Sequence, residues 1–177
     1  MAQKAEARSA YSSGHGAFVK RYRAPSTKHV LIAVDPGVRS PGVAWGDPSE
    51  GVEALKWWSP GSRPINPAQA LVDKVGVPET HALIVEWPQK YASKSACWAA
   101  VDQLRDMADA LPWKRVTKVS PRIWKGSIPK PVHHLRLRSI VPKERHAEWE
   151  SASPDARDAA ALWMWATELV DIGGVPR

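Results

Sequence analysis

The chain has 177 residues, which is enough for one domain with a substantial core and too few for two large lobes around a nucleotide cleft. Its single cysteine, Cys97, excludes an intramolecular disulfide framework and any metal site built from several cysteines. We find no apolar run of the roughly 18 residues that a membrane span needs, and residues 1–18 lack the apolar core of a secretory signal. We therefore expect a cytoplasmic protein without a membrane segment.

The formal net charge is +7, and it is unevenly distributed. Residues 1–28 contain six basic residues against one acidic residue, and residues 118–145 contain eight against one. These two segments carry +5 and +7, so the remainder of the chain is acidic. This distribution suits a protein that binds phosphates with some segments and cations with others, although a solvated basic surface remains an alternative for both segments.

The predicted elements follow in chain order. Residues 1–28 show no sustained apolar period, so we expect a flexible basic tail before a single domain at 29–177. Two apolar runs, 29–35 and 81–87, are typical of buried central strands. The remaining strands are expected at 42–46, 52–58 and 114–119. Helices are expected at 66–75, 93–111, 131–141 and 155–170, with an irregular basic loop at 121–130.

Three strands followed by alternating helices and strands predict an α/β fold. We expect a five-stranded mixed sheet with helices on both faces. Asn66 is the expected N-cap of the first helix, with Pro67 at its first position.

Four carboxylates stand out by position. Asp35 ends the first strand and Glu86 ends the fourth, while Asp155 and Asp158 lie three residues apart on one face of the last helix. If the two strands are parallel neighbours, Asp35 and Glu86 emerge at one sheet edge, and a helix across that edge can bring the other two to them. Taken singly, Asp35 could be a turn residue, and the helical pair could simply complement the helix dipole.

Together, the four acids predict a metal site. Clustered carboxylates repel one another and raise their own pKa values unless a cation accompanies them. Magnesium prefers oxygen ligands, and two such ions about 3.5–4 Å apart activate a water and stabilise the leaving oxygen in phosphodiester hydrolysis.

These residues also resemble a known family. The segment Asp35-Pro36-Gly37 through Gly42 is similar to the opening motif of RuvC-type Holliday junction resolvases. Leu83–Glu86 resembles their strand-end glutamate, and Pro154–Leu162 resembles their Asp-x-x-Asp-Ala helix. Ser120–Val141 resembles their basic segment. The divergence and short length are similar to those of bacteriophage members of the family.

The resemblance implies an RNase H-like fold and an Mg²⁺-dependent endonuclease that resolves four-way junctions by paired nicks. Asp35, Glu86, Asp155 and Asp158 would then be catalytic residues and ligands of two Mg²⁺ ions, for which Mn²⁺ can substitute. The family also implies a homodimer with two active sites on opposite strands of branched DNA. We expect the helix at 93–111 to form the dimer contact.

The basic segment and its surroundings supply candidate DNA-binding residues: Lys118, Arg122, Lys125, Lys130, Arg136 and Tyr91. The basic side chains could contact phosphates and Tyr91 could stack on an unpaired base. A solvated loop and core packing are their alternatives. His133 and His134 diverge on a helix because they are adjacent, so we do not expect them to bind one metal together.

Three other functions remain open or are disfavoured. An RNA-processing nuclease of the YqgF type shares the opening motif, and a non-catalytic nucleic-acid-binding module could keep the fold. Glu86 and the Asp155–Asp158 pair favour the resolvase over both. A sugar-kinase or actin-like phosphate loop is disfavoured because two such lobes need a longer chain.

Overall fold

The computed structural model describes residues 30–37, 40–62, 64, 66–76, 81–87, 94–109 and 112–168. The basic tail expected at 1–28 lies outside the described residues, as does Tyr91. Within the described part, no helix is both long enough and apolar enough to cross a bilayer.

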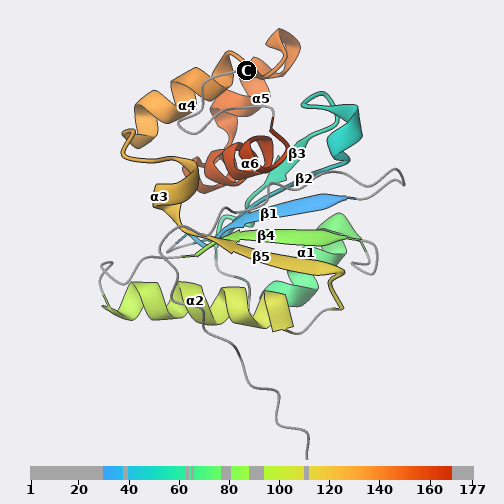
Figure 1. The fold of residues 1–177 in the computed structure, drawn as a ribbon, viewed down its shortest axis with the longest axis vertical. Coiled ribbons are helices and arrows are strands. Elements are labelled where there is room, and N and C mark those ends of the chain that lie inside the picture. Colours follow the sequence, from blue (N-terminus) through green and yellow to red (C-terminus); the bar gives the residue numbers. More distant parts are fainter. Residues whose placement is uncertain are drawn as a thin grey trace, which may run out of the picture.

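A five-stranded mixed sheet forms the centre of the fold, in the order β3-β2-β1-β4-β5 (Figure 1). The strands are β1 (Leu31–Asp35), β2 (Gly42–Gly46), β3 (Lys56–Trp58), β4 (Ala82–Glu86) and β5 (Arg115–Val119). β1, β2 and β3 pair antiparallel, whereas β4 lies parallel to both β1 and β5. This topology confirms the expected five-stranded mixed sheet.

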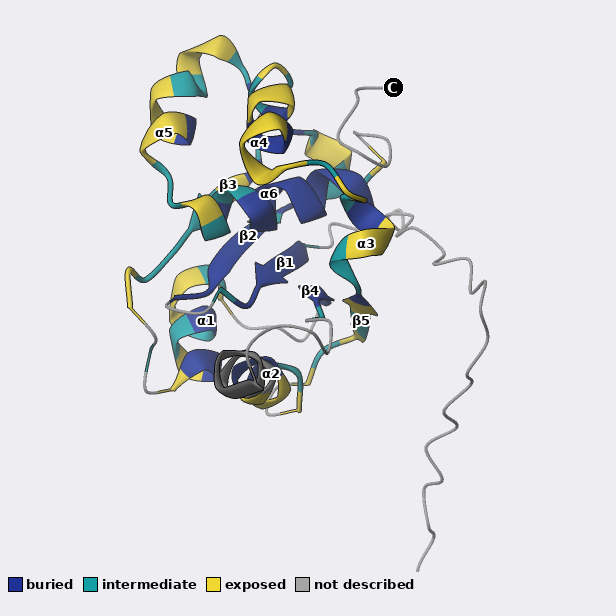
Figure 2. Cartoon of the chain, turned by 90° about the vertical axis from the view of Figure 1, so that its left-hand side faces the viewer, coloured by how far each residue is buried: buried dark blue, intermediate teal, exposed yellow. Residues whose placement is uncertain are grey.

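Helices cover both faces of the sheet (Figures 1 and 2). α1 (Pro67–Val75) and α2 (Lys94–Asp109) lie on one face. On the other lie α4 (Lys130–Arg138), α5 (His146–Ser151) and α6 (Pro154–Ala166), with the short α3 (Pro121–Trp124) after β5. Two short 3-10 turns, Pro48–Glu50 and Lys143–Arg145, complete the described elements.

Two hydrophobic clusters follow from the alternation of side chains along the strands. Ile32 and Val34 point to the face of α1 and α2, where they pack with Leu71 and Leu104. Leu31 and Ala33 point to the opposite face and pack against α6. Because a central strand is covered on both sides, the apolar run that begins β1 is continuous rather than alternating.

α6 is the most enclosed helix of the described structure. Its residues from Asp158 to Ala166 are all buried, since the sheet covers one side and the α3–α5 region covers the other (Figure 2). Trp124 and Trp149, each 1% exposed, belong to that outer cover. Trp163 fixes α6 to the sheet by donating its indole N–H to the Leu31 carbonyl at 3.0 Å.

Several predicted boundaries need correction. The third strand spans only Lys56–Trp58, because residues 52–55 form a turn and Arg145 binds the carbonyls of Val52, Glu53 and Leu55. The basic loop expected at 121–130 begins as α3, and the last helix begins at Pro154 and ends at Ala166. α5 was not anticipated. Asn66 does cap α1, as expected, by accepting from the Gln69 N–H at 3.0 Å.

Candidate active site

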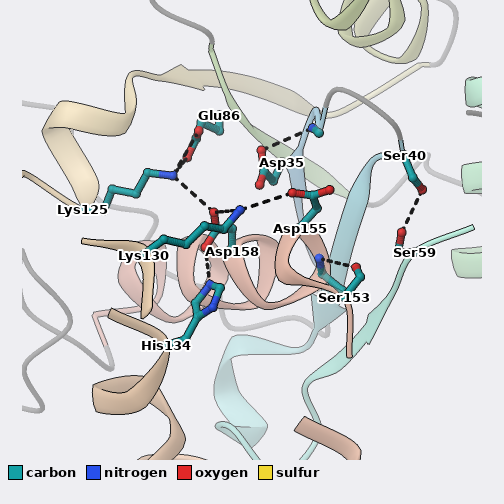
Figure 3. Close-up of polar contacts among 12 residues, drawn as sticks. Asp35, Ser40, Ser59, Glu86, Lys125, Lys130, His134, Ser153, Asp155 and Asp158 are labelled. Carbon is teal, nitrogen blue, oxygen red and sulfur yellow. Dashed lines mark hydrogen bonds and ion pairs between the residues drawn. The ribbon is translucent and has the colours of Figure 1, made fainter. Parts of the chain in front are cut away.

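The sheet places the first two carboxylates side by side. β1 and β4 are parallel, and Val34 pairs with Val85, so Asp35 and Glu86 leave the sheet at the same edge. Figure 3 shows the two side chains close to those of Asp155 and Asp158. Asp35 is 6% exposed and Glu86 is 8% exposed, so both carboxylates are held largely out of water.

The N-terminal part of α6 carries the second pair of acids, Asp155 and Asp158. Ser153 caps the helix by accepting from the Ala156 N–H at 3.1 Å, and Pro154 occupies the first turn, where no backbone donor is needed. Two glycines let this helix end approach the sheet. A Cβ at Gly37 would lie 2.7 Å from Asp155 Oδ2, and a Cβ at Gly42 would lie 2.6 Å from the Ala156 nitrogen.

Two lysines from the segment after β5 reach into the carboxylate cluster. Lys125 Nζ lies 2.9 Å from Glu86 Oε2 and 3.4 Å from Asp158 Oδ2. Lys130 Nζ lies 2.9 Å from Asp158 Oδ2 and 3.3 Å from Asp155 Oδ1. The two ammonium groups thus bridge acids that come from β4 and α6 (Figure 3).

Two further side chains orient the carboxylates. His134 Nε2, from α4, lies 2.5 Å from Asp158 Oδ1. The Trp124 indole donates to Glu86 Oε2 at 2.8 Å, and Lys125 lies over the Trp124 ring at 4.9 Å from its centroid. Each partner occupies one lone pair of its acid and leaves other oxygen positions for a cation or water.

Burial and mutual repulsion shape the electrostatics of the site. Desolvation, followed by the charges of Glu86 and Asp158, raises the pKa of Asp35 well above its usual value. Burial also raises the pKa of Glu86, against the opposing effect of Lys125. For Asp158, burial alone would raise the pKa, but the His134 hydrogen bond and the two lysines together lower it. The site therefore holds the pKa of Asp158 below its usual value and the pKa values of Asp35 and Glu86 above theirs.

The donor set fits a hard divalent cation. All four acids offer oxygen ligands, as Mg²⁺ and Mn²⁺ require. Asp35 is buried, and within the described residues it contacts no cationic side chain and receives only a weak 3.5 Å bond from the Gly37 N–H. As they stand, no three His, Cys, Asp or Glu side chains of the described chain converge on a single point. Lys125 and Lys130 lie between these acids, each within ion-pair distance of two of them.

The expected DNA-binding residues divide into two groups. Lys125 and Lys130 lie in the site itself, whereas Lys118, Arg122 and Arg136 are exposed on β5, α3 and α4. Lys118 lies over the Trp87 ring, at 4.2 Å from its centroid. These positions put basic side chains both at the carboxylates and on the neighbouring surface.

Two residues of the site were missed at the sequence level. His134 was expected to have no ligand role together with His133, and its contact with Asp158 depends on how α4 packs over α6. In the sequence, Trp124 is simply an apolar residue beside Lys125, and nothing indicates a contact with Glu86. No local pattern distinguishes a tryptophan that donates to a carboxylate from one that only fills the core.

Comparisons with known proteins give a limited result. No family model matches the chain, and no curated protein matches it. Among solved structures, it is similar to Thermus thermophilus RuvC in complex with Holliday junction substrate, at 18% identity and a TM-score of 0.46. It is also similar to a second Thermus thermophilus RuvC structure, at 21% identity and a TM-score of 0.40. Both alignments cover 78% of this chain and 92% of the other. Both of these solved structures are of RuvC, the type of protein that the sequence motifs resemble.

Proposed function

We propose that the chain is a metal-dependent endonuclease that cuts branched DNA and resolves four-way junctions by paired nicks. One observation carries the proposal: β1, β4 and α6, far apart in sequence, bring four carboxylates to one edge of an RNase H-like sheet, with two lysines among them. A protein that only binds DNA would gain nothing from buried acids next to a phosphate, because their charges repel it.

Asp35, Glu86, Asp155 and Asp158 would hold Mg²⁺. When bound, the metal would supply an activated water and charge stabilisation at the leaving oxygen. The chain's own residues do the positioning. Trp124 donates to one oxygen of Glu86, and His134 contacts one oxygen of Asp158, so each carboxylate is held in one orientation.

Lys125 and Lys130 would bind the phosphate that is cut. Burial alone would lower their pKa values, but the surrounding acids raise them, so both remain charged. An ammonium group near a phosphoryl oxygen stabilises the negative charge that develops there during hydrolysis. Asp35 contacts neither lysine, which leaves its carboxylate for the cation.

The wider surface would bind the arms of the substrate. Lys118, Arg122 and Arg136 are exposed near the site and can neutralise backbone phosphates, so affinity should fall steeply with salt. We further propose a homodimer through α2, because a two-fold protein suits a two-fold junction. Sedimentation measurements with and without junction DNA test this part separately.

The test is a gel assay on matched four-way junction, flap, linear duplex and RNA–DNA hybrid substrates, with Mg²⁺ or EDTA. Wild-type protein should nick the junction symmetrically and only with metal. Asp35→Asn should abolish cleavage and keep or strengthen junction binding, because it removes a buried repulsive charge. Asp73→Asn, an exposed acid on α1, serves as the matched control and should cut normally.

Other outcomes identify the alternatives. Tight binding without cleavage of any substrate would favour a non-catalytic binding module. Cleavage of the hybrid or of RNA alone would favour an RNA-processing nuclease. Undiminished cleavage by Asp35→Asn would refute the assignment of the site.

A further inference from the structure

A pocket of about 640 Å³ lies between α4, α5 and α6, next to the carboxylates. Its lining includes Lys130, His134, Leu135, Arg138, Trp149 and Arg157. Lys130 and His134 also contact Asp158, so the pocket and the candidate active site share a wall. Its volume falls in the range of pockets that hold small ligands.

The charges that line the pocket are unequal. Three cationic side chains face one carboxylate, Glu150, and that acid already binds Arg138, whose Nη2 lies 2.7 Å from Glu150 Oε1. Lys130 is likewise occupied by Asp155 and Asp158. The pocket therefore carries excess positive charge after its internal pairs are counted.

Arg157 is the lining cation that none of these ion pairs neutralises. Its Nε is shielded from solvent and has no hydrogen-bond partner, and its guanidinium forms no ion pair with any residue that the structure describes. A buried guanidinium nitrogen without an acceptor is costly. The planar fork of arginine matches two oxygens of a phosphate, so a phosphate in this pocket would relieve that cost.

The remaining wall is apolar and open. Leu135 is 70% exposed, the most exposed large hydrophobic side chain of the described residues, and Pro131 and Pro154 also line the pocket. Because the side chain of Leu135 faces water, it contributes little to the packing of α4. An apolar wall beside an unpaired guanidinium suits a ligand with a flat heterocycle and a phosphate, which is a nucleotide.

We propose that this pocket binds one unstacked nucleotide of the cleaved strand, next to the phosphate that is cut. Arg157 binds the nucleotide's own phosphate, and Leu135 covers its base. The inference rests on the proposed function and adds a reason for branch selectivity. Bases within a duplex stay stacked, whereas unstacking a base at a branch point costs less, so only branched DNA fills the pocket easily.

The first experiment measures binding without cleavage. Junctions carry a single 2-aminopurine, whose fluorescence rises on unstacking, at each position on either side of the cut phosphate. They are mixed with full-length Asp35→Asn protein. One position next to the cut should respond. Adding Leu135→Ala or Arg157→Gln should remove that response, whereas adding Val132→Ala or Lys56→Gln should preserve it. Val132 is an exposed apolar residue of α4, and Lys56 is an exposed cation of β3; neither lines the pocket.

The second experiment measures cleavage with an abasic site at the responding position. The wild-type rate should fall about tenfold, because the abasic site keeps the phosphate but loses the apolar packing of the base on Leu135. Leu135→Ala should cut the intact junction about tenfold more slowly than wild type and lose nothing further on the abasic junction. Because Leu135 is exposed, its truncation should leave the melting temperature unchanged, which separates a lost contact from a lost fold.

These experiments distinguish a wrong assignment of the pocket from a wrong proposed function. Wild-type cleavage of the junction, combined with no 2-aminopurine response or one that survives both pocket variants, overturns the pocket and leaves the nuclease intact. Absence of wild-type cleavage overturns the nuclease, and with it the assignment of the pocket to a cleaved strand. Arg157-dependent binding of free deoxyadenosine 5′-monophosphate without abasic coupling assigns the pocket to free nucleotides and overturns the strand assignment.

Discussion

Replacing Gly42 with alanine should disable the carboxylate centre without altering any acidic residue. The added Cβ would meet the backbone at the start of α6, 2.6 Å from the Ala156 nitrogen and closer still to the Asp155 carbonyl. An ordinary contact needs about 3.5 Å, so the helix end must retreat by about 1 Å or more. Asp155 and Asp158 would retreat with it, and a misplacement of about 1 Å costs on the order of 100-fold in rate.

The measurement is single-turnover cleavage of a four-way junction at saturating Mg²⁺, together with thermal melting. We expect a rate loss of about 100-fold and destabilisation of about 1–3 kcal/mol from overpacking. Gly61→Ala is the matched control, because a Cβ there meets nothing within 4 Å. The Gly61→Ala variant should be less stable, because an alanine is strained at the φ of 77° that Gly61 adopts. The cleavage rate of the folded variant should equal that of the wild type. A Gly42→Ala protein that is folded and cuts at the wild-type rate would refute the close approach of α6 to β2.

Three further predictions concern the surroundings of the site. Trp124→Phe keeps an aromatic side chain, although a smaller one, but removes the donor to Glu86, so cleavage should fall about tenfold and need more Mg²⁺, as a metal titration of the rate would reveal. Arg145→Ala removes the donor to three carbonyls and the cation stacked 4.1 Å from the Trp57 ring, so urea unfolding should show a loss of about 2–3 kcal/mol, with normal cleavage per folded molecule. Burial lowers the pKa of His133 to about 4, below the value near 6.5 expected when unfolded, so stability should be full above pH 6.5 and fall as pH drops towards 4. Urea unfolding at pH 7 and pH 5 should show a loss of up to about 2 kcal/mol from this residue, and His133→Leu should lose correspondingly less.

The sequence predicted the parts of the site that depend on strand and helix periodicity. An apolar run ending in an acid identifies a central strand and its edge, as for Asp35 and Glu86, and the parallel pairing of β1 and β4 places both ends together. Asp155 and Asp158 followed from their spacing of three residues at the start of the helix after Pro154, whereas the Ser153 cap emerged only in the structure. The strand ends and the helical spacing are local features that short stretches of sequence determine, whereas the pairing of β1 with β4 is a tertiary contact.

What could not be predicted depends on tertiary packing. Helix α5 is only six residues long, too short to display a helical period, and it is held by the buried Trp149. The third strand is shorter than its apolar pattern suggested. The residues before it form a turn, and Arg145, about 90 residues later, donates hydrogen bonds to carbonyls of that turn. The contact between His134 and Asp158 likewise depends on two helices whose relative position no local pattern specifies.

The enclosure of α6 has a consequence for when the protein becomes able to act. Asp35 and Glu86 are synthesised long before Asp155 and Asp158, and the helix that carries the latter pair also fills the cavity between the sheet and the α3–α5 cover. A growing chain that stops short of Ser153 thus lacks two of its four acids and the centre of one hydrophobic cluster. Under the proposed function, the chain becomes able to cut DNA at the same step of biosynthesis that completes its core. A partly synthesised chain therefore does not cut nearby nucleic acid.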